Sequence, residues 1–188
     1  MLEGNKLSQP HKQGWLAHTR HCHSPHFNQR PIGCDVSLLV IHNISLPPGV
    51  FGGPFIDDLF SGCLDCSYDP FFNQLQGLEV SAHFMINRQG VVTQYVSTEE
   101  RAWHAGLSSF DGRENCNDFS IGIELEGTDT ASYADEQYAA LITLTKSLRQ
   151  QYPLITKERI TGHSDIAPGR KTDPGVAFDW PRFLGALN

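Results

Sequence analysis

The stretch Ser37-Leu-Leu-Val-Ile-His42 is a short, uninterrupted apolar run that ends on a histidine. A run of this length between polar residues is typical of a strand that is buried on both faces of a sheet. The Pro- and Gly-rich residues 46–54 follow soon after and cannot continue a strand. The run therefore predicts a central strand that carries His42 at its carboxyl end.

A second strand is predicted over residues 119–125, where the side chains alternate in character. Ser120, Gly122 and Glu124 share one face of this strand, and apolar side chains occupy the other. Because Gly122 has no side chain, it leaves room beside Glu124 for another group to approach.

The other elements intermingle helices with strands. The patterns predict short helices over 54–60 and from 69–70 onward, a hairpin of 82–86 with 91–96, a helix over 135–152, a strand over 159–161 and a last turn near 180–184. Residues 97–118 show no clear period and predict a long surface loop. We therefore expect a mobile segment at 1–13 and one α/β domain at 14–188, with a mixed β-sheet flanked by helices.

Composition excludes several classes of protein. The 188 residues include 14 Lys and Arg against 21 Asp and Glu, a formal charge of −7, which argues against binding to nucleic acid. No apolar run is long enough to cross a bilayer, and the first residues lack the apolar centre of a signal peptide. We therefore expect a cytoplasmic protein with no membrane partner.

The five cysteines are expected to be reduced thiols, because their number is odd and their spacing fits no disulfide framework. Cys63 and Cys66 have the spacing of a zinc knuckle, but no second Cys/His pair with a matching interval is present. We interpret them as free thiols, with a redox or metal role as the alternative.

Three residues are candidate metal ligands by their position. His42 ends one predicted strand, His163 follows another, and Asp173 lies ten residues later, far enough for the chain to fold back. Sites gather at the carboxyl ends of strands in α/β sheets, and two histidines with a carboxylate match the three protein ligands of a catalytic zinc. Position alone leaves the alternative open that these are ordinary core or surface residues.

Glu124 and Lys171 are candidates for catalysis. A carboxylate on an interior sheet face is costly unless it is paired or functional, so Glu124 is either a general base beside a metal or an outward-facing glutamate on a half-exposed strand. Lys171 lies two residues before Asp173, which in extended chain places both side chains on one face. It could then stabilise an oxyanion, although a basic pair beside proline is also typical of a solvated turn.

Several longer segments carry a more specific pattern. They are Leu39-Val-Ile-His-Asn-Ile-Ser-Leu-Pro-Pro-Gly49, Ser81-Ala-His83, Arg101-Ala-Trp-His-Ala-Gly106, Asn117-Asp-Phe-Ser-Ile-Gly-Ile-Glu-Leu-Glu-Gly127, Thr161-Gly-His163, Asp165-Ile-Ala-Pro168 and Arg170-Lys-Thr-Asp-Pro-Gly175. Together they resemble the AmpD family of bacterial cytoplasmic N-acetyl-anhydromuramoyl-L-alanine amidases. That family belongs to the zinc amidase group that includes phage T7-type lysozyme and the peptidoglycan recognition proteins. The match runs from about Gly14 to Trp180.

The resemblance implies one zinc ion on His42, His163 and Asp173, with Glu124 as the catalytic carboxylate and Lys171 as the positive group near the scissile carbonyl. Many relatives have Cys as the third ligand, whereas this chain has Asp173, as AmpD enzymes do. The implied reaction is hydrolysis of the amide between anhydro-N-acetylmuramic acid and L-alanine of soluble muropeptides, in the recycling of cell-wall peptidoglycan.

Four further residues are candidates for substrate binding. Trp103 and His104 lie in the predicted long loop, where an indole could stack on a sugar. Asn43 could hydrogen-bond the peptide and Arg113 could meet a substrate carboxylate. The expected partner is a small muropeptide, bound by a monomer. The alternatives are an amidase that acts on polymeric peptidoglycan and a non-catalytic muropeptide-binding module.

Overall fold

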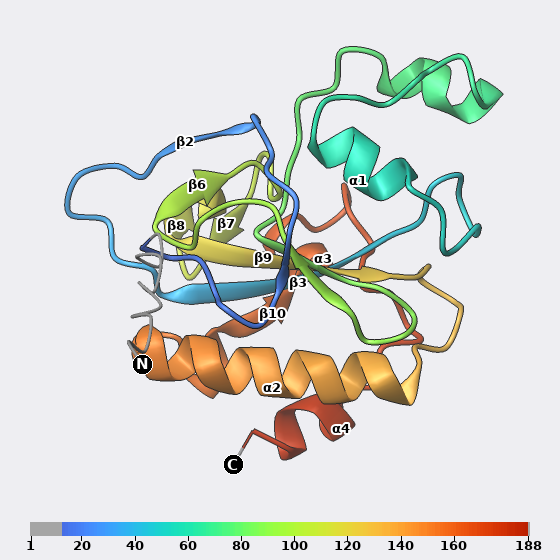
Figure 1. The fold of residues 1–188 in the computed structure, drawn as a ribbon. Coiled ribbons are helices and arrows are strands. Elements are labelled where there is room, and N and C mark those ends of the chain that lie inside the picture. Colours follow the sequence, from blue (N-terminus) through green and yellow to red (C-terminus); the bar gives the residue numbers. More distant parts are fainter. Residues whose placement is uncertain (1–12, 188) are drawn as a thin grey trace, which may run out of the picture.

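The structure, a computed structural model, describes residues 13–187 and is built around a six-stranded sheet (Figure 1). In spatial order the strands are β1 (Arg20–His21), β5 (Val92–Gln94), β4 (Phe84–Ile86), β9 (Ser120–Glu126), β3 (Leu38–Ile44) and β10 (Ile160–Gly162). Within this sheet of residues 13–187, β4 and β5 pair antiparallel, as the hairpin pattern predicted, and the other pairings are parallel. The predicted α/β fold with a mixed sheet is confirmed.

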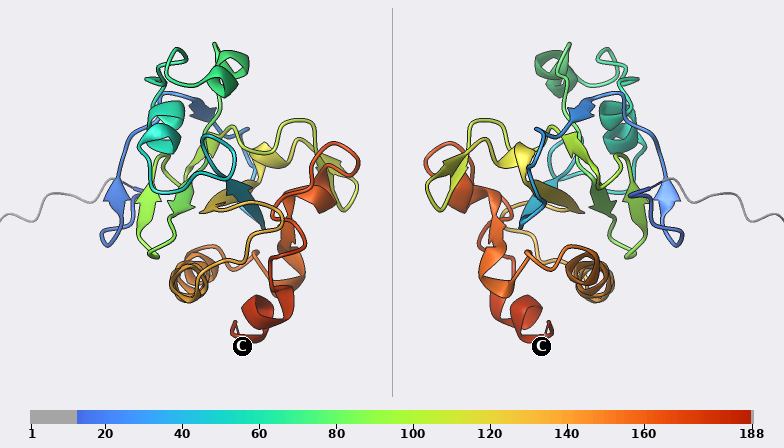
Figure 2. Two further views of the ribbon diagram at one scale, coloured as in Figure 1. Left: turned by 90° about the vertical axis from the view of Figure 1, so that its right-hand side faces the viewer. Right: turned by 90° about the vertical axis from the view of Figure 1, so that its left-hand side faces the viewer.

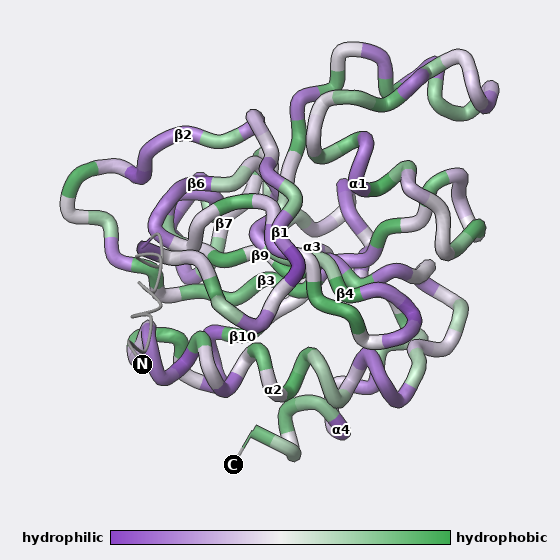
Figure 3. The backbone as a smooth tube through the Cα atoms, viewed as in Figure 1, coloured by the Kyte–Doolittle hydropathy of each residue, from purple (hydrophilic) through white to green (hydrophobic). Residues whose placement is uncertain are grey.

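The central pair β3 and β9 arises from the two strongest sequence patterns. All seven residues of β9 and the first five of β3 are buried, and the pair runs in register from Leu38 beside Ser120 to Ile44 beside Glu126. The hydropathy colouring of Figure 3 shows both strands as mainly hydrophobic segments in the middle of the molecule. Because both faces of these strands are buried, a polar side chain on them is destabilising unless it has a partner or a function.

The helices cover the sheet unequally. Helix α2 (Asp135–Gln151) lies along one face, and α4 (Trp180–Gly185) packs beyond it (Figures 1 and 2). The other face is covered in part by α1 (Phe55–Phe60) and the 3₁₀ helix η1 (Pro70–Leu75), which starts at the Asp69 cap that the sequence indicated. Short helices η3 (Lys157–Arg159) and α3 (His163–Ile166) flank β10.

Alternation along the central strands separates a packing face from a functional face. The side chains of Leu39, Ile41, Ile121 and Ile123 join the core cluster with α2. Residues of the other parity, which include His42 on β3, therefore point away from α2. The loops that follow the strands determine which other side chains contact the residues on this face.

The long loop predicted over residues 97–118 is wrong in part. This segment contains β6 (Glu100–Ala102), β7 (Ser109–Phe110), β8 (Arg113–Glu114) and the 3₁₀ helix η2 (Cys116–Asp118). Strand β6 pairs with β2 (Phe27–Gln29), which lies far away in sequence, and β7 pairs with β8. Strands of two or three residues are too short to show an alternating pattern, so these strands could not be predicted from the sequence.

The predicted mobile segment at residues 1–13 lies almost wholly outside the described residues, which begin at Gln13. The assignment of 14–188 to one domain remains a prediction. Between residues 13 and 187, no helix has both the length and the apolar character needed to cross a membrane.

Candidate metal centre and active site

Three side chains from separate parts of the chain meet at the carboxyl ends of β3 and β10. His42 lies on β3, His163 is the first residue of α3, and Asp173 lies on the loop after α3. The Nδ1 atoms of the two histidines are 2.9 Å apart, and each lies 3.0 Å from Asp173 Oδ2. In the described part of the chain, this is the one group of His, Cys, Asp or Glu side chains arranged closely enough to hold a metal ion.

The loop that carries Asp173 is folded back by a backbone contact. The N–H of Ser164, in α3, donates to the carbonyl oxygen of Asp173 over 2.9 Å. The ten-residue interval between His163 and Asp173 is therefore long enough for the chain to bring Asp173 back beside His163, as the sequence indicated.

The donor set fits a divalent ion such as zinc. Bonds of about 2.0–2.1 Å in a tetrahedral site place neighbouring ligand atoms about 3.3 Å apart, close to the separations found here. Each histidine can offer a lone pair only when its ring is neutral, and burial lowers the pKa of His42 to about 4. Burial would raise the pKa of Asp173, but hydrogen bonds with His163 and His42 outweigh it and hold that pKa below its usual value.

Both histidines turn Nε2 into the protein. His163 Nε2 lies 3.0 Å from the carbonyl oxygen of Ala105, and His42 Nε2 lies 2.9 Å from Nδ1 of His104. His104 Nε2 in turn lies 3.1 Å from Oγ of Ser120. These partners fix the ring orientations that direct both Nδ1 atoms toward Asp173.

Glu124 lies beside this cluster on the neighbouring strand. The parallel register pairs Glu124 of β9 with His42 of β3, so both side chains share the face away from α2. The side chain is 9% exposed, and its Oε2 atom is buried without a hydrogen-bond partner. Burial and the charge of Asp173 raise the pKa of Glu124 well above its usual value, against the opposing charge of Lys171. The interpretation of Glu124 as a half-exposed outward glutamate is therefore wrong.

A cavity of about 620 Å³ opens over these residues and is lined by Glu124, His163, Lys171 and Asp173. Its remaining lining falls into an apolar set and a polar set. The apolar set includes Leu46, Leu59, Phe60, Phe71, Leu75, Val80 and Trp103; the polar set includes Asp129, Thr130, Arg170 and Thr172. A volume of this size suits a small ligand with both apolar and polar parts.

The structure brings three of the four predicted substrate residues to the cavity. Trp103, His104 and Asn43 line it, and Asn43 donates from Nδ2 to Asp129 Oδ1 over 2.8 Å. The ring of His104 also contacts His42, a role that the sequence did not suggest. Arg113 is not among the lining residues: its guanidinium lies 4.0 Å over the ring of Phe119.

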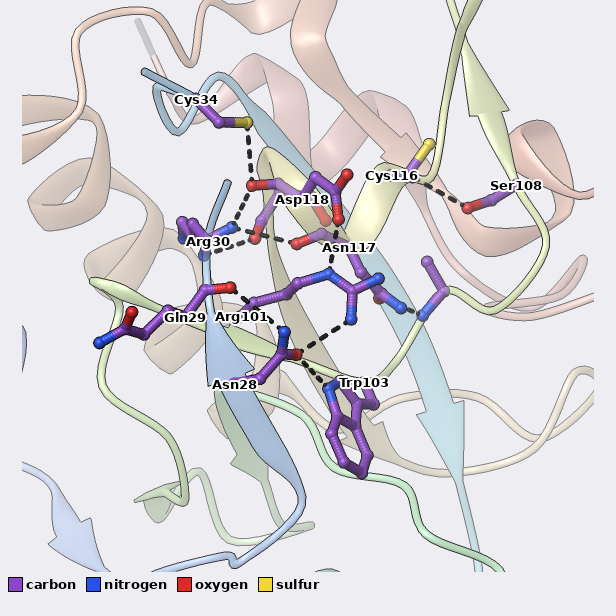
Figure 4. Close-up of polar contacts among 12 residues, drawn as sticks. Asn28, Gln29, Arg30, Cys34, Arg101, Trp103, Ser108, Cys116, Asn117 and Asp118 are labelled. Carbon is purple, nitrogen blue, oxygen red and sulfur yellow. Dashed lines mark hydrogen bonds and ion pairs between the residues drawn. The ribbon is translucent and has the colours of Figure 1, made fainter. Parts of the chain in front are cut away.

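Trp103 is held at the cavity by a polar network that is visible in Figure 4. Its Nε1 donates to Oδ1 of Asn28 over 2.7 Å, and Arg101 Nη1 donates to the same oxygen over 3.2 Å. Arg101 is itself paired with Asp118. Asn28 therefore restrains the indole through Nε1 and also contacts Arg101, a link between β2 and β6 that sequence spacing could not reveal.

Arg170 is a residue that the sequence analysis missed. It lines the cavity, and its Nη2 donates to the carbonyl oxygens of Ala105 and Leu107. In the sequence, only its place directly before Lys171 indicated that Arg170 could lie at the site. Cys63 and Cys66 are free cysteines, and neither lines the cavity.

Comparison with known proteins places this geometry in context. The model of the Amidase_2 family, N-acetylmuramoyl-L-alanine amidase, matches residues 28–176. The 1,6-anhydro-N-acetylmuramyl-L-alanine amidase AmpD of Escherichia coli K12 is 58% identical over 172 residues, which cover 92% of this chain and 93% of that protein.

Two solved structures are informative. A crystal structure of a selenomethionine derivative of AmpD is similar with a TM-score of 0.91 at 55% identity, and the match covers 94% of this chain and 98% of that one. AmpDh3 of Pseudomonas aeruginosa, in complex with anhydromuramic pentapeptide, is similar with a TM-score of 0.61 at 32% identity. That match covers 83% of this chain and 61% of AmpDh3.

Proposed function

The chain belongs to the Amidase_2 family of N-acetylmuramoyl-L-alanine amidases, and from that premise we propose how its own residues hydrolyse a muropeptide. It is an amidase that cleaves the amide between anhydro-N-acetylmuramic acid and L-alanine. The proposal assigns one zinc ion to His42, His163 and Asp173, the general base to Glu124 and the oxyanion contact to Lys171.

The observation that carries these roles is the buried, unpartnered Oε2 of Glu124 beside the His/His/Asp cluster. A carboxylate without a partner in the interior is destabilising, and such groups persist where the chemistry uses them. Its raised pKa suits a group that takes up a proton and later gives it back.

His42, His163 and Asp173 would hold the zinc ion, which would supply Lewis-acid chemistry to activate water and polarise a carbonyl. Glu124 Oε2 accepts the proton of the attacking water and delivers it to the leaving amine of L-alanine. Lys171, which is exposed to the cavity, places its ammonium near the carbonyl oxygen as negative charge develops there.

The substrate would lie along the cavity, with its apolar parts against the apolar lining residues and its polar parts against the polar lining residues. Trp103, fixed by Asn28, offers a flat apolar surface for the sugar ring. Asn43 and Arg170 offer amide and guanidinium groups for the peptide. The complex of AmpDh3 with anhydromuramic pentapeptide supports a ligand of this class.

The cellular setting is part of the same proposal. We infer that one domain, residues 14–188, acts as a monomer in the cytoplasm on wall fragments that are being recycled. The support is the extensive identity with AmpD amidases.

The test combines metal content with activity on one preparation. Purified protein is incubated with anhydromuramoyl-tripeptide and, separately, with intact peptidoglycan, before and after chelation and zinc readdition. We expect about one zinc per chain, release of free tripeptide from the soluble fragment and little action on the polymer. Glu124→Gln should retain zinc but lose activity.

Two results would contradict the proposal. Preferential cleavage of intact peptidoglycan would indicate a lytic enzyme. Tight binding of the soluble fragment without cleavage, at full zinc occupancy, would favour a non-catalytic binding module.

A further inference from the structure

The orientation of the two ligand histidines depends on acceptors for their inner nitrogens. A neutral imidazole carries its proton on one nitrogen only, so Nδ1 is free to bind a cation when Nε2 carries the proton. Each Nε2–H then needs an acceptor behind it. For His163 that acceptor is the carbonyl oxygen of Ala105, which can only accept. For His42 it is Nδ1 of His104, whose own Nε2–H can donate to Ser120.

Both acceptors therefore come from two consecutive residues, His104 and Ala105. This pair belongs to no helix or strand, because β6 ends at Ala102 and β7 begins at Ser109. Hydrogen bonds of a sheet or helix do not fix its backbone, so another contact must.

Arg170 Nη2 donates to the carbonyl oxygen of Ala105, and the contact on the N–H groups of the pair is the side chain of Asn117, in η2 next to Asp118 (Figure 4). Its Oδ1 accepts from the backbone N–H of His104 over 3.1 Å and from that of Ala105 over 2.8 Å. Asn117 is only 6% exposed, so water cannot readily replace its oxygen. The ring of His104 packs closely against Gly122, where a Cβ atom would lie 2.5 Å from Cγ of His104.

We propose that Asn117 is a positioning residue for the metal centre: by holding the N–H groups of His104 and Ala105, it orients the acceptors of both ligand histidines. The proposal rests on the zinc site proposed above. Asn117 touches neither the ligand atoms nor the cavity; it acts through two residues that set the direction of each Nδ1 lone pair.

The chain offers a matched control in Asn87. Its Oδ1 also accepts from two backbone N–H groups, those of Gln89 and Val91, over 3.1 and 2.9 Å. These bonds lie in the turn of the β4–β5 hairpin, and Asn87 does not line the cavity. Asn87→Ala thus removes the same kind of contact as Asn117→Ala without affecting the segment behind the histidines.

The experiment measures zinc dissociation constants of the full chain by competition with a chromophoric chelator, for wild type, Asn117→Ala, Asn117→Asp and Asn87→Ala. Cobalt(II) is then substituted for zinc, because its d–d absorption reports coordination geometry independently of activity. Thermal unfolding of the metal-free proteins measures how much each variant loses in stability alone.

We expect Asn117→Ala to bind zinc about 10–100-fold more weakly than wild type and to alter the cobalt spectrum, since loss of a partner behind a ligand typically has that effect. Asn117→Asp keeps an acceptor oxygen and should recover most of the affinity. Asn87→Ala should bind zinc like wild type even where its unfolding temperature falls.

A zinc affinity and cobalt spectrum of Asn117→Ala that match those of Asn87→Ala would overturn the inference. If Asn117→Ala does not fold, the pair His104→Phe and His104→Asn tests the same segment, because only Asn retains an acceptor near Nδ1; equal zinc affinity in both would again overturn it. A wild-type chain that binds no zinc refutes the metal site itself, a result distinct from failure of the positioning role.

Discussion

Replacing Glu124 by glutamine should abolish activity and should make the metal-free protein progressively more stable relative to wild type as the pH rises. Glu124 is buried, its Oε2 has no partner, and its pKa is raised well above the value of 4.5 that it has in an unfolded chain. The substitution keeps the shape of the side chain and removes its titration.

The magnitude follows from proton linkage. Above pH 4.5 the unfolded chain releases the Glu124 proton, whereas the folded metal-free protein keeps it up to its raised pKa. The folded state then binds more protons, so the free energy of unfolding of wild type falls as pH rises, by up to about 1.4 kcal/mol per pH unit from this group. Glu124→Gln lacks this slope. The new amide leaves a buried polar group unsatisfied, a penalty of about 1–3 kcal/mol that does not vary with pH.

The assay is urea unfolding of both proteins in excess chelator at pH 5, 6, 7 and 8. The informative quantity is the free energy of unfolding of the variant minus that of wild type, in which the other titrating groups largely cancel. We expect this difference to rise with pH. A difference that stays constant across the series would mean that Glu124 ionises normally in the fold, and the reasoning on its burial would be refuted.

Three other substitutions test separate parts of the site. Lys171→Ala should lower kcat about 10²–10³-fold, as loss of an oxyanion contact does, with zinc content unchanged; a wild-type kcat would remove Lys171 from the reaction. Glu126→Ala removes the carboxylate that accepts from the backbone N–H groups of Gly52 and Arg88, and the loss of each hydrogen bond should cost about 0.5–1.5 kcal/mol in urea unfolding; unchanged stability would show that water replaces the carboxylate. Gly122→Ala should destabilise the protein by about 1–3 kcal/mol, because the added methyl group would overpack against His104. The unfolding temperature should fall; an unchanged unfolding temperature would show that the ring can move aside.

The strands that carry the site could be predicted from the sequence because each has a strong local pattern. The apolar run that ends at His42 and the alternation around Glu124 both became buried central strands. Their pairing could not be predicted from these patterns, since register depends on contacts between segments about 80 residues apart. Yet it is the register that sets His42 beside Glu124.

The site residues were predictable to different degrees. Position alone made His42, His163 and Asp173 only candidates, and the resemblance to AmpD supplied the ligand set. Arg113 is predicted to meet a substrate carboxylate because of its charge, but it lies in β8, which pairs with β7, and its guanidinium lies over Phe119 instead of at the cavity. Asn117 could not be found at all, because a side chain that holds two backbone N–H groups has no periodic signature.

The placement of His42 on a buried strand has a consequence for how the protein responds to metal supply. Small zinc domains such as zinc fingers are unfolded without metal because their ligands are brought together only by the ion. Here a sheet with a large apolar core holds His42 in place, so the chain should fold before it is loaded. Binding then adds stability by mass action, and the unfolding temperature should follow the free zinc concentration. When zinc is scarce, a cell would keep an intact but idle pool of this amidase, ready to be recharged without new synthesis.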